Sequence, residues 1–201
     1  MVSSALKKRF ENAAISIVKP LAGVGITPNH VTALGVLVAC LTAWLYSIWG
    51  GDRLRLVAAA ATLLLSGLLD AVDGVLARST GNASRFGGFF DSVADRYSDA
   101  LAFSGLVLGG LCDAWVGLAA LVGSLMVSYC RSRAEAEGVK MAGVGLAERA
   151  ERMLLLAALS LASYWWLPAL NYGVMALAAL AHFTVIQRTL YYRKRVDGSQ
   201  S

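Results

Sequence analysis

Long apolar segments alternate with short polar ones along most of the chain. At about 20 residues each, such segments are long enough to cross the roughly 30 Å hydrocarbon core of a bilayer as helices. They predict membrane spans over residues 31–49, 56–78, 86–110, 115–133, 147–167 and 171–191. We therefore predict an all-α, polytopic membrane protein with six transmembrane helices, which form one bundle over residues 31–192.

The segment before the first span has an amphipathic pattern. Over residues 4–18, charged positions lie on one helical face and apolar positions on another, namely Leu6, Phe10, Ala13, Ala14 and Ile17. This segment is too polar to span, so we expect an interfacial juxtamembrane helix over residues 3–20, with its basic side toward anionic headgroups. Together with the bundle it would form a single membrane domain of residues 1–201.

The composition supports a membrane protein, and the charge distribution predicts its orientation. Of the 201 residues 57% are hydrophobic, and the formal net charge is +5. An even number of spans puts both termini on one side, which then carries every Lys and Arg except Arg53 and Arg55. The positive-inside rule makes that side cytoplasmic. We predict a multi-pass protein of the cell membrane with no nucleic-acid partner.

Four aspartates lie inside or at the edge of the second and third predicted spans, at Asp70, Asp73, Asp91 and Asp95. A charge in hydrocarbon costs roughly 2.5–3.5 kcal/mol on insertion scales, which makes intramembrane acids functional candidates. Each pair shares a helix face, and an antiparallel hairpin would bring all four carboxylates together at its closed end. Such like charges need cations between them, and carboxylate oxygens suit Mg²⁺, Mn²⁺ or Ca²⁺.

Two glycines and an arginine accompany these acids. Gly74 and Gly87 leave the backbone open to a ligand, and Arg78 lies on the same face as the first acid pair. A guanidinium is suited to binding phosphate. Carboxylates, a metal, an arginine and open backbone together predict a site for a phosphate-bearing substrate.

The spacing D-x2-D-G-x2-A-R-x8-G-x3-D-x3-D, from Asp70 to Asp95, resembles the signature of the CDP-alcohol phosphotransferases, integral membrane enzymes of phospholipid biosynthesis. The resemblance implies transfer of a phosphatidyl-type group from CDP-diacylglycerol or CDP-archaeol to an alcohol, with release of CMP. It further implies a homodimer and two Mg²⁺ ions, or Mn²⁺, held by Asp70, Asp73, Asp91 and Asp95. In this interpretation Asp95 is also the catalytic general base.

A capped turn opens the first span. Thr27 is a good N-cap and Pro28 a good first helical residue, so the free N–H groups there suit either a phosphate or plain helix capping. The resemblance favours contact with the nucleotide. It implies that the CDP-linked lipid binds at Asn29, His30, Val31, Thr32, Gly74, Ala77, Arg78 and Ser84.

A second basic cluster flanks the polar loop between the fourth and fifth spans, at Arg131, Arg133, Arg149 and Arg152. These cations could serve as membrane anchors, but the interleaved Glu148 and Glu151 indicate a polar pocket for an anionic acceptor such as a sugar phosphate. The segments S-Y-x-R-S-R-A-E-A-x-G and G-L-A-E-R-A-E-R-M resemble the inositol-phosphate-using branch of the family. That branch commonly has Lys where this chain has Arg131, and often Pro where it has Ala150. The resemblance implies inositol 1-phosphate as acceptor.

Two alternatives stay open at this point. One is the same reaction with glycerol 3-phosphate or another alcohol as acceptor. The other is a divalent-cation transporter, which would need polar residues at mid-depth on several spans. The first, fifth and sixth spans have almost none. We also expect Arg96 and Asp99, three residues apart beside the acids, to form a supporting ion pair.

Overall fold

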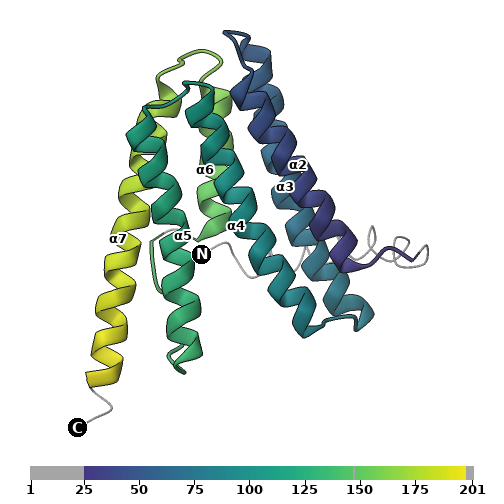
Figure 1. Ribbon diagram of the computed structural model, residues 1–201, viewed down its shortest axis with the longest axis vertical. Helices are drawn as coiled ribbons and strands as arrows, with labels where there is room; N and C mark the ends of the chain where they lie inside the picture. The colour runs from purple at the N-terminus through teal and green to yellow at the C-terminus, as the bar shows by residue number, and fades with distance from the viewer. Residues whose placement is uncertain (1–24, 147, 198–201) are drawn as a thin grey trace.

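A computed structural model describes residues 25–146 and 148–197, and the regular structure of these residues is entirely helical. The helices, labelled as in Figure 1, are α2 (Pro28–Ser47), α3 (Arg53–Thr80), α4 (Arg85–Leu108), α5 (Ala114–Ala136), α6 (Arg149–Ala162) and α7 (Ala169–Asp197). The predicted all-α class is confirmed for this part of the chain. The predicted interfacial helix over residues 3–20 lies outside the described residues.

The helices run along the long axis of the molecule in two groups. Helix α2 packs against both α3 and α4, whereas α3 and α4 make little contact with each other. Helix α5 packs against α7, and the groups are joined by α4 packing against α5 and by α6 contacting α3 and α7 (Figure 1). Helices α3 and α4 are therefore joined by their loop and held together by α2. Helix α6 packs against α3.

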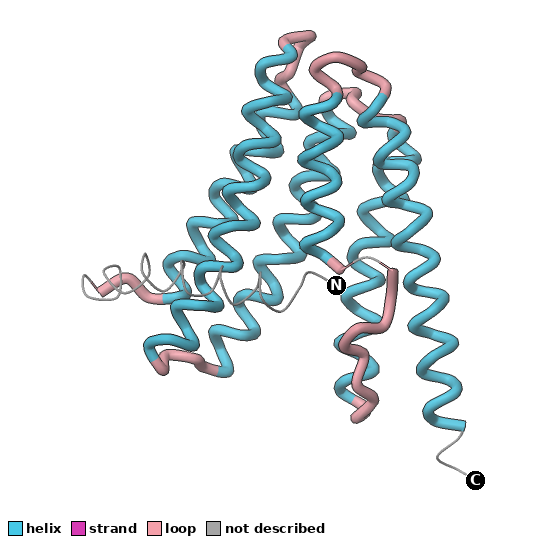
Figure 2. The backbone as a smooth tube through the Cα atoms, turned by 180° about the vertical axis from the view of Figure 1, so that it is seen from behind, coloured by secondary structure: helices cyan, strands magenta, loops and turns pink. Residues whose placement is uncertain are grey.

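The connections lie alternately at the two ends of the bundle. The α3–α4 and α5–α6 connections lie at the same end as the C-terminal end of α7 (Figure 2). After α5 the chain runs back along the bundle before α6 begins, so α6 has only 14 residues. Helix α6 ends at Ala162, so the predicted fifth span, residues 147–167, is too long at its C-terminal end.

Four helices are long and apolar enough to cross a membrane: α2, α3, α5 and α7. Helix α6 would rise only about 21 Å at 1.5 Å per residue. Helix α4 has 24 residues, but its first 15 carry the charged side chains Arg85, Asp91, Asp95, Arg96 and Asp99. A membrane protein with several spans is supported, and the count of six stays a prediction that depends on α4 and α6.

Close helix packing relies on small residues at the crossings. A Cβ added to Gly105 of α4 would lie 2.6 Å from the carbonyl oxygen of Ala43 on α2, so only glycine fits there. Small residues that let backbones approach are typical of helix pairs in membranes. The core between the two groups is apolar and fully buried at Leu56, Phe103, Leu106, Leu170 and Val174.

Two caps fix the ends that form the candidate site. Thr27 and His30 make a capping box at the start of α2, and Ser84 Oγ accepts from the Gly87 N–H at 2.9 Å at the start of α4. Helix α3 ends at Gly81, whose φ of 68° is a left-handed conformation that glycine adopts without strain. The hairpin loop is thus shorter than predicted, because Ser79 and Thr80 continue α3.

Candidate active site

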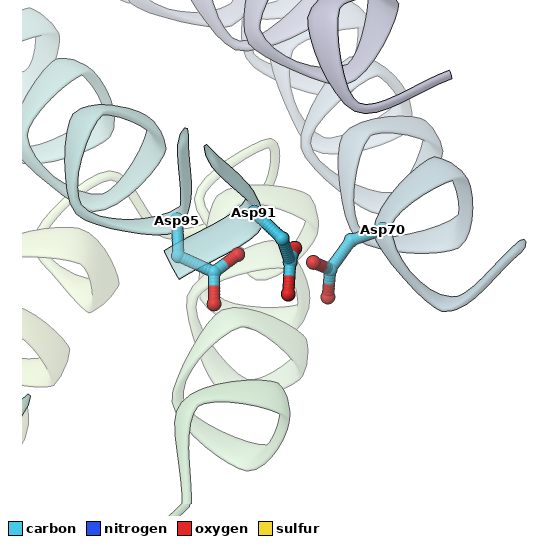
Figure 3. Close-up of side chains that lie close together, drawn as sticks. All are labelled: Asp70, Asp91 and Asp95. Atoms are coloured by element: carbon cyan, nitrogen blue, oxygen red, sulfur yellow. The ribbon is translucent and has the colours of Figure 1, made fainter. Parts of the chain in front are cut away.

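Three carboxylates converge between α3 and α4. Asp70 lies on α3, and Asp91 and Asp95 lie one turn apart on α4. Each offers one oxygen atom, and the three atoms lie within 4.8 Å of one another. Figure 3 shows the side chains pointing toward a common point. The sequence prediction that the two acid pairs meet is confirmed for these three residues.

Asp73 lies beside this group and is oriented differently. Its Oδ2 accepts a hydrogen bond of 2.5 Å from the hydroxyl of Thr32 on α2, and both side chains are buried. The helix that packs over the hairpin thus supplies a partner for the fourth carboxylate. The role of Asp73 as a metal ligand stays a prediction.

The three carboxylates fit a divalent cation. Hard, anionic oxygens this close together repel one another, and a Mg²⁺ or Mn²⁺ ion would relieve that repulsion. The protein itself supplies part of the compensation through Arg149 on α6. Its Nη1 lies 2.7 Å from Asp95 Oδ1 and 3.1 Å from Asp70 Oδ2.

A cavity of about 220 Å³ opens on one side of the carboxylates. It collects six of the eight residues predicted to bind the CDP-linked lipid, namely Asn29, Thr32, Gly74, Ala77, Arg78 and Ser84, together with Asp73, Gly87 and Asp91. The glycines keep this space open. A Cβ on Gly87 would lie 3.1 Å from Ser84 Oγ and 3.3 Å from Asn29 Oδ1.

His30 and Val31 do not line this cavity. The His30 ring accepts from the Thr27 N–H through Nδ1 at 3.4 Å, which makes it part of the helix cap. Val31 is 6% exposed and packs with Leu76 in a small apolar cluster. Neighbours in sequence point to different sides of α2, and these two positions serve the fold.

A second cavity, of about 270 Å³, lies on the other side of the carboxylates. Asp70 and Asp95 form part of its wall, and its basic residues are Arg96, Arg131, Arg149, Arg152 and Arg188. The structure therefore brings three of the four predicted acceptor-binding arginines to one place. Such a concentration of guanidinium groups suits a phosphate.

The fourth, Arg133, lies elsewhere. It lines a neighbouring cavity and pairs with Glu137. Residues two apart on a helix point to nearly opposite sides, so Arg131 and Arg133 could not both face the same cavity. The assignment of Arg133 to the acceptor pocket is not supported by this geometry.

Sequence reasoning missed Arg188 on α7. Its side chain is 6% exposed and donates to the carbonyl oxygens of Val144, at 2.9 Å, and Val127, at 2.5 Å. The sequence did indicate a role for Arg188, because an arginine inside a predicted membrane span is costly and is therefore a functional candidate.

The expected ion pair between Arg96 and Asp99 is wrong. Arg96 pairs with its neighbour Asp95 at 3.1 Å. Asp99, fully buried, pairs instead with Arg149 at 3.0 Å and lies 3.5 Å from Arg152. The long side chains of Arg149 and Arg152, at the start of α6, reach Asp99 and take the place expected for Arg96.

A third cavity, of about 360 Å³, is apolar and runs between α3 and α6. Leu63, Leu64, Leu68, Met153 and Leu154 line it. Asp70 and Arg149 form its polar end, so it opens at the carboxylate group. An apolar groove ending at a polar site suits the tails of a lipid whose headgroup lies among the charges.

The sequence model of one protein family, described as CDP-alcohol phosphatidyltransferase, matches residues 25–186. The chain belongs to this family. The membership is consistent with the aspartate signature and favours an enzyme over a cation transporter.

Curated relatives resemble this family member along nearly its whole length. Archaetidylinositol phosphate synthase of Pyrococcus horikoshii is 39% identical, over 96% of this chain and 98% of the relative. The protein of the same name from Methanothermobacter thermautotrophicus is 38% identical, over 97% and 98%. Phosphatidylinositol phosphate synthase of Mycobacterium tuberculosis is 32% identical, over 89% and 85%.

Solved structures of the mycobacterial synthase share this fold. The crystal structure with CDP-DAG bound has a TM-score of 0.80 at 32% identity and covers 89% of this chain and 92% of that one. The structure in complex with manganese and citrate has a TM-score of 0.79, with coverage of 89% and 88%. These similarities connect the family to a CDP-linked lipid and to a divalent metal.

Proposed function

We propose that this family member transfers a phosphatidyl-type group from a CDP-linked lipid to the hydroxyl of inositol 1-phosphate and releases CMP. One observation carries the proposal. The carboxylate group lies where the three cavities meet, because Asp91 lines the first, Asp95 the arginine-rich one, and Asp70 both the arginine-rich and the apolar ones. Nucleotide, acceptor phosphate and lipid tails would each have a cavity, with the reacting phosphorus between them.

The donor side is supported by chemistry at the first cavity. Arg78 offers a cation, and Gly74 and Gly87 let the nucleotide approach the backbone. The Ser84 hydroxyl and the Asn29 amide add hydrogen-bonding groups. The mycobacterial synthase of the same fold holds CDP-DAG. Diacyl and isoprenoid ether donors both present this same CDP headgroup.

We propose two divalent ions at the carboxylates, Mg²⁺ or Mn²⁺, held by Asp70, Asp91 and Asp95 with Asp73 completing the set. When bound, such ions polarise a pyrophosphate and stabilise charge on a leaving phosphate oxygen. The manganese complex of the mycobacterial synthase supports this assignment.

Asp95 would act as the general base. Its carboxylate faces the arginine-rich cavity, and Arg149 and Arg96 hold its two oxygens at 2.7 and 3.1 Å. In the reaction the acceptor oxygen forms a bond to the lipid-side phosphorus, and the bond from that phosphorus to CMP breaks. The acceptor proton moves to Asp95, and the electron pair leaves with CMP.

The arginine-rich cavity would bind the phosphate of the acceptor. Arg131, Arg149, Arg152 and Arg188 line it, and the last two are almost fully buried. Charge-assisted hydrogen bonds in a partly buried site are strong, so a phosphorylated acceptor is favoured over a neutral alcohol. Both archaeal relatives are named as synthases of an inositol phosphate lipid.

We further propose that the protein is a single membrane domain whose site faces the cytoplasm. Asp70 lies in the second half of α3 and Asp91 and Asp95 in the first half of α4, so the site is nearer the α3–α4 connection. The basic end of α7 lies at the same end of the bundle as that connection (Figure 2). The positive-inside rule favours a cytoplasmic location for that end. A homodimer is expected from the family resemblance.

The test is CMP release by purified protein with CDP-diacylglycerol or CDP-archaeol as donor and a panel of acceptors. Inositol 1-phosphate should give the fastest release, ahead of glycerol 3-phosphate, serine and free inositol. The Asp91→Asn variant, which removes one proposed ligand, is the matched control and should be inactive. Faster release with glycerol 3-phosphate would reassign the acceptor, and no release with any acceptor would remove the proposed activity.

A further inference from the structure

Arg149 contacts both the proposed metal ligands and the acceptor cavity. Its Nη1 lies 2.7 Å from Asp95 Oδ1, as an ion pair, and donates to Asp70 Oδ2 at 3.1 Å. Both acceptors belong to the three-carboxylate group that fits a cation. The same side chain lines the arginine-rich cavity proposed for an anion. One guanidinium therefore faces a cation site and an anion site at once.

The other end of this guanidinium is anchored. Arg149 Nε donates to Asp99 Oδ1 at 3.0 Å, and Asp99 is fully buried. Asp99 in turn lies 3.5 Å from Arg152. Because the contact at Nε is held inside the bundle, a small rotation about it can carry the Nη groups from the carboxylates toward the cavity.

Resting on the proposed function, we infer that Arg149 competes with the divalent cation for Asp70 and Asp95 and thereby couples metal binding to acceptor binding. A cation placed on these carboxylates stands close to the guanidinium charge, and like charges at short range disfavour each other. A phosphate in the adjoining cavity gives Arg149 another anionic partner. A phosphate bound there thereby lowers the repulsion between the Arg149 guanidinium and the metal ion.

The coupling must work in both directions. If the acceptor phosphate raises the affinity for the metal by some factor, the metal raises the affinity for the phosphate by the same factor. Couplings of this kind are typically about 5- to 150-fold. Arg149 would act as a positioning residue that favours the site with both metal and acceptor phosphate bound over the site with only one of them.

The experiment measures Mn²⁺ affinity of the full-length protein in detergent by electron paramagnetic resonance, with and without inositol 1-phosphate. Wild-type protein should bind Mn²⁺ about tenfold more tightly when inositol 1-phosphate is present. Arg149→Gln keeps a donor for Asp99 but removes the charge. It should bind Mn²⁺ alone about tenfold more tightly than wild type and show a smaller response to inositol 1-phosphate.

Arg133→Gln is the matched control, because Arg133 lines the neighbouring cavity and pairs with Glu137. It should leave the affinity for Mn²⁺ alone unchanged. Should Arg149→Gln fold poorly, the wild-type comparison with and without inositol 1-phosphate still tests the coupling.

Weaker or equal Mn²⁺ binding by Arg149→Gln, or no response of wild type to inositol 1-phosphate, would overturn the inference. These titrations need no turnover, so their failure is separate from failure of the CMP-release assay. An enzyme active with inositol 1-phosphate but lacking the coupling would keep the proposed function and lose this inference.

Discussion

The Thr32 hydroxyl on α2 donates a 2.5 Å hydrogen bond to Asp73 on α3, across 41 positions of sequence. Both side chains are more than nine-tenths buried. The contact ties the predicted nucleotide-binding turn of α2 to the first acid pair. It therefore makes the position of Asp73 depend on the packing of a separate helix.

Replacing Thr32 by Val keeps its shape and removes the hydroxyl. Asp73 then loses its partner in a buried place, which costs about 1–3 kcal/mol of stability. Heat- or detergent-induced unfolding of the purified protein measures this loss. Thr32→Ser, which retains the hydroxyl, should recover most of it. Equal stability of Thr32→Val and wild type would show that this hydrogen bond contributes nothing.

Replacing Asp95 by Asn removes the proposed base and keeps the size of the side chain. Turnover should fall by about 10²–10⁴-fold, the usual contribution of a positioned base, while the CDP-linked lipid still binds. CMP release and donor binding, measured separately, check the two halves of this expectation. Near-normal CMP release by Asp95→Asn would exclude Asp95 as the base.

Arg188 and Arg133 make a matched pair for the acceptor cavity. Arg188 lines that cavity, whereas Arg133 lines its neighbour and pairs with Glu137. Losing a hydrogen bond to a charged group costs about 1.5–3 kcal/mol. Arg188→Ala should therefore raise KM for inositol 1-phosphate by about tenfold or more. Arg133→Ala should change it little. A larger rise in KM for Arg133→Ala than for Arg188→Ala would assign Arg133, and not Arg188, to the acceptor cavity.

Adding a methyl group at Gly87 should narrow the first cavity. The new Cβ of Gly87→Ala would lie 3.1 Å from Ser84 Oγ and 3.3 Å from Asn29 Oδ1. KM for the CDP-linked lipid should rise with little change in KM for inositol 1-phosphate. Gly88→Ala is the control, because Gly88 lines the same cavity but its Cβ meets nothing within 4 Å; it adds a methyl group without displacing Ser84 or Asn29 and should have the smaller effect. Equal donor KM values for the two variants would show that Gly87 does not shape the donor site.

Removing divalent ions should abolish CMP release. The carboxylate group has hard oxygen donors, so Mg²⁺ or Mn²⁺ should restore activity after chelation with EDTA. The chelated protein should remain folded, because Arg149 and Arg96 still pair with these acids. Circular dichroism before and after chelation checks the fold. Full activity without divalent ions would remove the metal site.

The sequence alone determined the helical elements and the residues of the motif. Long apolar segments and the cap Thr27 are local features, so the predicted helices agree with the described ones within a few residues, except at the C-terminal ends of α6 and α7. The fixed spacing from Asp70 to Asp95 placed the acids on the faces that meet. Even Arg188 carried a local signal, as a charge within an apolar run.

Tertiary structure decided which of these residues touch. Asp99 pairs with Arg149, 50 positions away, instead of with Arg96, and Asp73 accepts a hydrogen bond from Thr32 on a separate helix. The helix period already points Arg131 and Arg133 to different sides, but the packing of α5 decided which of them faces the arginine-rich cavity. Helix periodicity follows from local backbone geometry and was available from sequence. Contacts between helices depend on how whole surfaces pack, which no single segment encodes.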